Sequence, residues 1–187
     1  TVQIGDRIEL AILSGEGGNL GDTVGISFRI EAFEGNMVID GKLAIEDVDA
    51  SLEGTAASFE LVRSDTGEQV DDGDVMLGSA GRYTLEVPDS VPQGDYLLRM
   101  KTATSLSRLS PSFYLDSIGP WDVDFLLPNG DCDGDNSVTV FDYAILSDAF
   151  DSQPGDPNWD GRGDLDQDGM VTVFDYGMLS DAFDTSF

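Results

Sequence analysis

The residues of this chain best suited to chemistry are aspartates that recur at alternate positions in two segments near the C-terminus. Residues 131–142 read DCDGDNSVTVFD and residues 164–175 read DLDQDGMVTVFD, so Asp stands at the first, third, fifth and twelfth places of both. Extended to residue 184, the two copies share 15 identities in 21 positions at an offset of 33 residues. Ca²⁺ takes about six to eight oxygen ligands at about 2.3–2.6 Å. The matched copies therefore predict two Ca²⁺ sites rather than a solvated acidic turn.

Each twelve-residue loop supplies a full set of oxygens if the chain turns sharply at its sixth place. Asn136 and Gly169 stand there, and both tolerate a left-handed backbone. The seventh place then offers a carbonyl oxygen, and the ninth a hydroxyl or a bridging water. We expect Val138 and Val171, at the eighth place, to pair the two loops through a short strand and to bury their side chains. The predicted metal ligands are Asp131, Asp133, Asp135, Ser137, Thr139 and Asp142 in the first loop, and Asp164, Asp166, Asp168, Met170, Thr172 and Asp175 in the second.

The charge of the chain supports a bound cation. The chain has 37 acidic and 9 basic residues, a net charge of −28, and its last 59 residues hold 14 Asp, no Glu and a single base, Arg162. Carboxylates a few ångströms apart repel by about 1 kcal/mol or more per pair even in a water-like dielectric. A divalent cation removes this repulsion, and Mg²⁺ is less suitable because it prefers a smaller octahedral shell. The acidic surface also excludes nucleic acid and anionic lipid as partners.

The residue types that are missing exclude several kinds of site. The sequence has no His and one Cys, Cys132, which excludes Ser-His-Asp and Cys-His catalysis, His-ligated zinc, a Cys-based zinc cluster and an internal disulfide. Cys132 occupies the second place of its loop, where we expect the side chain to point outward, as a free thiol or an intermolecular link. No stretch approaches the roughly 18 apolar residues of a membrane helix, so we expect no membrane insertion. Thr1 is expected to begin a mature or trimmed chain.

Short helices are needed to hold each loop closed. Apolar residues at helical spacing predict them over residues 143–150 and 176–183. The residues that precede the loops, 128–130 and 159–163, contain Pro and Gly and cannot form an entering helix. Each unit is therefore a calcium loop followed by one exiting helix.

Duplicated calcium loops of this kind, with Asp at the twelfth place and a spacer at residues 156–160, resemble the dockerin family. The resemblance covers residues 129–187. It implies a secreted, non-catalytic module with two Ca²⁺ ions, which binds cohesin domains, β-sandwiches on scaffold or surface proteins, through its helices. The likeness of the two copies also implies a pseudo-two-fold arrangement, in which either helix could serve in binding.

The tenth and eleventh places of the loops differ from those of the well-studied enzyme-borne dockerins. Those proteins often carry Ser-Thr there, whereas both copies here carry Val-Phe, which favours either an apolar contact with the partner or a place in the core of a small module. Further along each helix, a Ser-Asp pair stands where basic residues are often found, which predicts a partner that is not strongly acidic. The predicted partner-binding residues are Val140, Phe141, Ser147, Asp148, Val173, Phe174, Ser180 and Asp181.

The N-terminal part of the chain shows the period-two apolar alternation of half-buried strands. The clearest examples are residues 8–12, 24–30, 59–61, 83–87, 95–100 and 113–115. Short strands separated by turn signals predict an immunoglobulin-like antiparallel sandwich over residues 1–117. Gly94-Asp95-Tyr96 at a strand start is similar to the tyrosine corner of such sandwiches. Residues 118–130 are then a connector, and residues 131–187 form a small all-α dockerin-like module with two calcium loops.

Three functions are compatible with this organisation. The first is a non-catalytic extracellular protein whose module docks on a cohesin-like β-sandwich. The second is a self-assembling filament or surface subunit, in which the module of one copy docks on the immunoglobulin-like domain of the next, a contact that does not close on itself. The third is a carbohydrate-active or carbohydrate-binding sandwich carried by a dockerin. Since no catalytic motif accompanies the acidic residues, we expect no enzyme activity.

Overall fold

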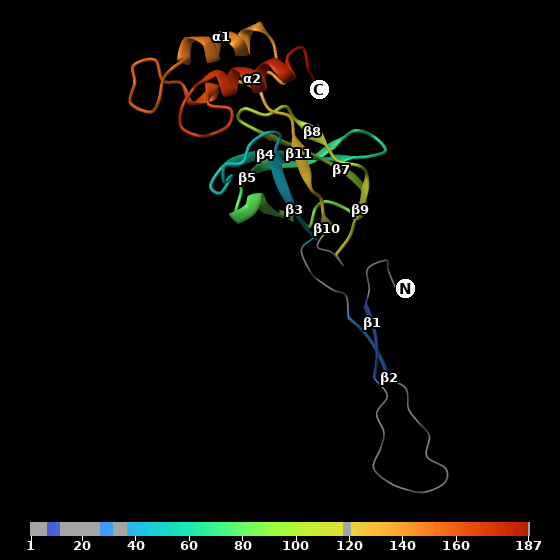
Figure 1. Cartoon of the computed structure of the whole chain (residues 1–187). Coiled ribbons are helices and arrows are strands. Elements are labelled where there is room, and N and C mark those ends of the chain that lie inside the picture. Colours follow the sequence, from blue (N-terminus) through green and yellow to red (C-terminus); the bar gives the residue numbers. More distant parts are fainter. Residues whose placement is uncertain (1–6, 12–26, 32–36, 118–120, 187) are drawn as a thin grey trace, which may run out of the picture.

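The computed structural model of the chain describes residues 7–11, 27–31, 37–117 and 121–186 (Figure 1). Strands β1 (Arg7–Ala11) and β2 (Ser27–Glu31) pair antiparallel into a two-stranded sheet of their own. They overlap the strands predicted over residues 8–12 and 24–30, of which residues 12 and 24–26 lie outside the described part of the chain. Whether their side chains are half-buried, as the alternation predicts, lies outside what the structure describes.

Two further sheets form a sandwich. The first is built on β3 (Met37–Ile45), which pairs antiparallel with β6 (Arg82–Val87) and, along its other edge, parallel with β10 (Trp121–Asp122) and β11 (Phe125–Leu127). The second has β4 (Ala56–Arg63) and β7 (Gly94–Thr102) at its centre, with β5 (Gln69–Met76) beside β4, and with β8 (Arg108–Leu109) and β9 (Phe113–Leu115) beside β7. A single 3₁₀ turn, Ser79–Gly81, precedes β6.

The fold class predicted from the sequence is confirmed, with one correction to its strand directions. The N-terminal part is mainly β with two sheets, and two helices follow at the C-terminus. The sandwich is not purely antiparallel, because the chain crosses from β9 in the second sheet to the free edge of β3 in the first. Part of the predicted connector thereby supplies β10 and β11 to the sandwich. The outer limits of the two domains stay a prediction.

Strand β3 lies at the centre of its sheet but is absent from the predicted strands. Its buried residues alternate along the strand as expected, but Gly41 interrupts the apolar pattern. A Cβ atom at this position would overlap the carbonyl oxygen of Val123 and lie 2.7 Å from the Tyr83 hydroxyl. Close packing therefore requires glycine here. Because glycine breaks the apolar alternation, the strand could not be recognised from that pattern.

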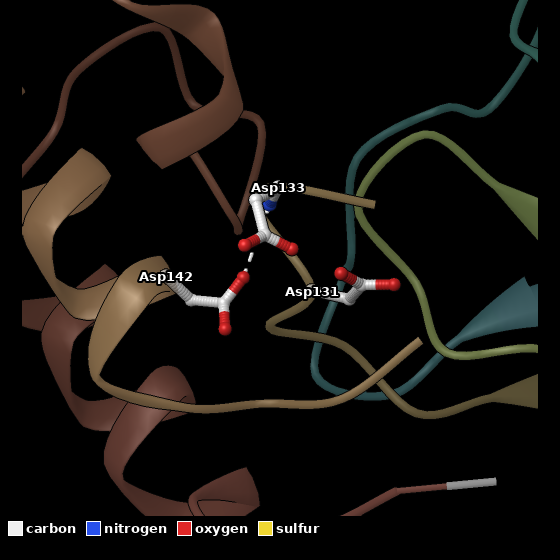
Figure 2. A group of neighbouring side chains, drawn as sticks. All are labelled: Asp131, Asp133 and Asp142. Carbon is white, nitrogen blue, oxygen red and sulfur yellow. Dashed lines mark hydrogen bonds between the residues drawn. The ribbon is translucent and has the colours of Figure 1, made fainter. Parts of the chain in front are cut away.

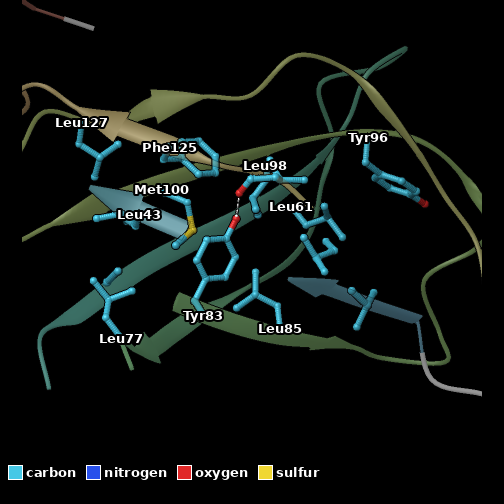
Figure 3. Packing of buried hydrophobic residues seen from close by; sticks show 14 of the residues in the cluster. Leu43, Leu61, Leu77, Tyr83, Leu85, Tyr96, Leu98, Met100, Phe125 and Leu127 are labelled. Atoms are coloured by element: carbon cyan, nitrogen blue, oxygen red, sulfur yellow. Dashed lines mark hydrogen bonds between the residues drawn. The ribbon is translucent and has the colours of Figure 1, made fainter. Parts of the chain in front are cut away.

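The core of the sandwich lies between the two sheets (Figure 3). Nineteen of the described residues form it, and Leu98, Met100 and Leu115 have no exposed surface. Tyr83 is a polar member of this core, and its hydroxyl donates a hydrogen bond to the carbonyl oxygen of Val123. Burial of this kind stabilises a fold by roughly 25 cal/mol per Å² of apolar surface, so the sandwich has a conventional hydrophobic basis.

The tyrosine corner predicted at the start of β7 is confirmed. The Tyr96 hydroxyl donates a hydrogen bond of 2.6 Å to the carbonyl oxygen of Pro92, four residues upstream, and its side chain is fully buried. This is the geometry that fixes one corner of immunoglobulin-like sandwiches.

The C-terminal part contains two helices, α1 (Val140–Ala149) and α2 (Val173–Ala182), which lie side by side at one end of the sandwich (Figure 1). A short 3₁₀ turn, Gly161–Gly163, precedes the second loop in place of an entering helix, as predicted. A second core lies here, formed by Leu106, Cys132, Val138, Leu146, Ala149, Leu165, Val171 and Leu179. Within the described residues, no helix is long and apolar enough to cross a membrane.

Candidate calcium sites and docking face

Both helices begin three residues earlier than the apolar spacing predicts, because each starts with a capping box. Thr139 is the N-cap of α1, and its hydroxyl accepts a hydrogen bond of 3.2 Å from the backbone N–H of Phe141. The side chain of Asp142 in turn accepts a hydrogen bond of 2.7 Å from the backbone N–H of Thr139. The second repeat has the same box, with Thr172 and Asp175. The twelfth-place Asp is thus held on the first turn of a helix.

The loop backbone turns where the sequence predicts it and at one further place. Asn136 and Gly169, at the sixth place, have φ angles of 71° and 90°, which confirms the left-handed conformation. The fourth place is left-handed as well, with φ of 83° at Gly134 and 60° at Gln167. The turn at Gly134 could have been predicted from the sequence, because glycine favours a left-handed backbone. The turn at Gln167 could not, because glutamine has no such preference.

The first loop gathers the carboxylates of Asp131, Asp133 and Asp142 (Figure 2). One oxygen from each lies within 4.8 Å of the others. Asp131 and Asp142 are fully buried, whereas Asp133 is exposed. The Asp133 N–H donates a hydrogen bond of 3.0 Å to Asp142, which ties the start of the loop to the helix (Figure 2).

The second loop gathers Asp164, Asp166 and Asp168 to the same closeness. One oxygen of Asp164, Oδ1, is buried without a hydrogen-bond partner. Burial and, to a smaller extent, the neighbouring carboxylates raise the pKa of Asp164 to about 6. The hydrogen bond from the N–H of Gly169 lowers this pKa but does not cancel the rise. A buried acceptor without a donor, beside other carboxylates, is the environment that a hard cation satisfies. The residues present therefore fit Ca²⁺.

The remaining predicted ligands lie in the same loops but outside these clusters. Asp135 is exposed and accepts a hydrogen bond of 2.8 Å from the N–H of Ser137, as Asp168 does from Met170 in the second loop. Asp175 is fully buried and accepts hydrogen bonds from two backbone N–H groups at the start of its loop. The ligand roles of the seventh-place carbonyls and the ninth-place hydroxyls stay predictions.

The prediction that Val138 and Val171 pair the two loops directly is wrong. Val138 exchanges backbone hydrogen bonds of 2.8 and 2.9 Å with residues 184–185, which follow α2. Val171 exchanges bonds of 2.9 and 3.0 Å with residues 151–152, which follow α1. Each loop is thus hydrogen-bonded to the residues that follow the helix of the other repeat. Both side chains are fully buried, as expected.

The expectation that Cys132 points outward is also wrong. Its side chain is 1 % exposed and belongs to the second core, as does Leu165 at the same place of the second loop. The carboxylates at the first and third places gather in the acidic cluster of the loop, so the side chain between them turns toward the core. Burial raises the pKa of the Cys132 thiol to about 12, which keeps it protonated.

The residues predicted to bind a partner lie on the surface. Val140 is 59 % exposed and Phe141 67 %, and their counterparts Val173 and Phe174 are 62 % and 70 % exposed. The alternative that these side chains form the core of the module is therefore wrong. The Ser-Asp pairs are exposed as well, at residues 147–148 and 180–181.

The two repeats are arranged about a pseudo-two-fold relation. Tyr143 of α1 and Tyr176 of α2 occupy equivalent positions, and their rings pack edge to face with centroids 6.0 Å apart. Contact between equivalent residues of two copies places them on an axis that exchanges the copies.

Residues 129–184 match the family model of the dockerin type I domain. The C-terminal part of this chain is a dockerin domain. Dockerin domains typically bind calcium, and the two aspartate clusters lie in the loops of this domain. None of the curated proteins compared with the chain matches it.

Two solved structures resemble the dockerin domain together with the sandwich. They are type II cohesin–X-dockerin complexes from Acetivibrio cellulolyticus, one an N-terminal and the other a C-terminal interface mutant. Their TM-scores are 0.58 and 0.56, and each alignment has 18 % sequence identity and covers 80 % of this chain and 96 % of the matched chain. An alignment of this length extends well beyond the dockerin domain, so the likeness includes the fold of the sandwich.

Proposed function

We propose that this chain is a non-catalytic extracellular protein whose dockerin domain, organised by two Ca²⁺ ions, docks on a cohesin-like β-sandwich. The match to the dockerin family and the likeness to chains of cohesin–dockerin complexes support docking as the activity. Dockerin modules occur in extracellular or cell-surface proteins, which supports the location. The observation that carries the proposal is the exposure of Val140, Phe141, Val173 and Phe174, directly after two loops that gather carboxylates.

Calcium would act here by fixing the start of each helix. The proposed ligands of each ion are the oxygens at the first, third, fifth, seventh, ninth and twelfth places of its loop. The twelfth-place Asp links the two structures, because it belongs to the loop and also caps the helix. A cation held by the loop would therefore orient the first helical turn, and with it the exposed Val-Phe pair.

The proposed docking face consists of the Val-Phe pair and the Ser-Asp pair of each helix. Exposed aromatic side chains such as Phe141 and Phe174 are enriched in protein interfaces, and the valines beside them add apolar contact area. The face carries Asp148 and Asp181 but no base, so its partner should be neutral or basic at the contact. Because the helices are related by pseudo-symmetry, either copy of the face can be presented to a single partner.

Binding to a panel of cohesin domains, type II cohesin included, tests this proposal. In calcium, isothermal titration should detect at least one cohesin with a 1:1 stoichiometry. Each single variant, Phe141→Ala or Phe174→Ala, should still bind cohesin through its unchanged helix. The double variant should bind with an affinity lower by about a hundredfold or more.

Phe150→Ala combined with Phe183→Ala is the matched control, since these two side chains are about half exposed at the other end of the helices. This control should bind as the parent does. Equal binding by the Phe141/Phe174 double variant and the parent would refute the docking face. Calcium-dependent growth of the free chain into long assemblies would instead support docking between copies.

A further inference from the structure

The two calcium loops, nearly identical in sequence, have different electrostatic surroundings. Lys101, in β7 of the sandwich, reaches the first loop, where its ammonium group pairs with Oδ2 of Asp131 and lies 3.5 Å from Oδ1 of Asn136. Among the described residues, no Lys or Arg pairs with a carboxylate of the second loop. Its equivalent carboxylate, Asp164, has a buried oxygen without a partner instead.

The lysine is held in this position by the segment that follows it. The carbonyl oxygen of Thr104 accepts hydrogen bonds of 3.1 and 3.0 Å from the N–H groups of residues 130 and 131. The Ser107 N–H donates a hydrogen bond of 2.6 Å to the side chain of Asn136. Leu106, between them, is fully buried in the core of the dockerin domain. The sandwich thus contributes a hydrogen-bonded loop to the first calcium site. On the side of the second loop, the described residues of the sandwich bring carboxylates instead, since Asp47 and Asp49 line one hollow with Asp166 and Asp168.

From this arrangement we infer that Lys101 is a built-in counter-cation of the first calcium loop, which makes the two sites unequal. Asp131 pairs with the ammonium group of Lys101 and is also a proposed ligand of Ca²⁺, so the two cations would compete for its carboxylate. A positive charge at the edge of a calcium site opposes entry of the ion, whether the lysine stays or is displaced. The first site therefore binds Ca²⁺ more weakly than the second.

A second consequence concerns the contact between the two domains. While the first site alone is empty, Lys101 neutralises part of the buried charge of the first loop, and this ion pair joins the dockerin domain to the sandwich. Calcium in the first loop weakens that pair, because the ion draws the same carboxylate. Occupancy of the first site is thereby coupled to the junction between the domains, whereas occupancy of the second is not.

Calcium titrations of single-site variants of the full chain test the inference, which rests on the proposed calcium binding. Asp168→Ala leaves only the first site intact, and Asp135→Ala leaves only the second. We expect the first site to be at least fivefold weaker than the second. Adding Lys101→Met should strengthen the first site by about tenfold, which corresponds to about 1.4 kcal/mol, and should leave the second unchanged.

Charge and packing are separated by two further variants. Lys101→Arg keeps the charge and should leave the first site weak. Lys42→Met removes an exposed lysine of β3 and should change neither affinity. Melting curves of Asp135→Ala in saturating calcium report on a dockerin domain whose first loop is empty, and adding Lys101→Met to this variant should lower the stability of the domain.

Equal affinities of the two sites, or a first site that weakens when Lys101 is replaced by Met, would overturn the inference and leave the docking proposal standing. Absence of calcium binding at both sites would overturn the inference together with the proposed role of calcium.

Discussion

The sandwich and the dockerin domain are stabilised by different means. Among the described residues, nineteen buried hydrophobic residues form the core of the sandwich, and none of its buried polar residues is charged. The core of the dockerin domain contains eight, and one of these, Leu106, comes from the sandwich. By contrast, the fully buried charged residues of the described chain are Asp131, Asp142 and Asp175, all in the calcium loops. The sandwich is thus organised around apolar contacts, whereas the dockerin domain is organised around carboxylates that accept backbone N–H groups.

This difference follows from size. A domain below about 70–80 residues rarely buries enough apolar surface to be stable by itself, and small domains commonly add a metal or disulfides. With one Cys in the whole chain, disulfides within the domain are excluded. Buried carboxylates that repel one another destabilise the folded state until a cation joins them. The dockerin domain should therefore depend on Ca²⁺, and the sandwich should not.

Removal of calcium is the largest expected perturbation of this contrast. In excess chelator, we expect the helical circular dichroism signal to be lost while the thermal transition of the sandwich persists. At a free calcium concentration of 100 times its dissociation constant, each site adds about 2.7 kcal/mol to the free energy of unfolding of the dockerin domain, so two sites add about 5 kcal/mol. Refolding on addition of Ca²⁺, but not of Mg²⁺ at the same concentration, is the control. A helical signal that survives chelation would contradict the contrast.

Core substitutions give the next largest effect and test whether calcium can compensate. Leu98→Ala in the sandwich and Leu146→Ala in the dockerin domain remove equally buried side chains, and each should cost about 2–5 kcal/mol. Raising calcium should restore the transition lowered by Leu146→Ala, because ion binding stabilises that domain. Raising calcium should not change the melting temperature of the sandwich in Leu98→Ala. Differential scanning calorimetry at low and high calcium measures both, and equal rescue of the two variants would refute the separation.

The turns of the two loops and the gathering of their aspartates could be predicted from the sequence because these features are local. Aspartate spacing and the tolerance of Asn136 and Gly169 for a left-handed turn are visible within twelve residues. The helix starts were also encoded locally, in the Thr-x-x-Asp capping boxes, but the apolar spacing placed them three residues late. Here the capping signal was the more informative one.

Features that depend on long-range contacts could not be predicted in this way. Gly41 interrupts the central strand only because a tyrosine and a carbonyl from elsewhere in the chain pack against it. Cys132 is buried because the loop turns its carboxylates to the opposite side. Lys101 stands thirty residues before its carboxylate partner, and a single lysine in a strand gives no pattern that would reveal the contact.

In the sandwich, the buried hydroxyl of Tyr83 allows a smaller and more specific test. Tyr83→Phe leaves the Val123 carbonyl without its donor and should cost about 1–3 kcal/mol at neutral pH. Burial, with nearby aspartates, raises the pKa of Tyr83, so the folded state holds this proton more tightly than the unfolded chain. The stability of the parent should therefore fall as pH rises above about 10, where unfolded tyrosine ionises.

Urea unfolding of the sandwich at several pH values measures this effect. The gap between the parent and Tyr83→Phe should be constant from pH 7 to about pH 9 and should narrow at higher pH, because phenylalanine does not ionise. Chelator changes neither curve if the sandwich is independent of calcium. A gap that stays constant through pH 11 would show that burial does not hold the proton on Tyr83.

The smallest expected effect concerns the residues at which the helices of the dockerin domain begin. Thr172→Ala removes the N-cap hydroxyl of α2 and should cost about 1 kcal/mol, whereas Thr172→Gly should cost only a few tenths. In saturating calcium, a loss of about 1 kcal/mol lowers the melting temperature of a domain this small by roughly 4–8 °C. Thr139→Ala and Thr139→Gly repeat the comparison in the first loop. If the hydroxyl served mainly as a calcium ligand, Ala and Gly would weaken calcium binding equally and the alanine variant would show no excess loss. A larger loss for Ala than for Gly in both repeats would instead assign the ninth-place threonine to the helix, and leave the oxygen at that place to a bridging water.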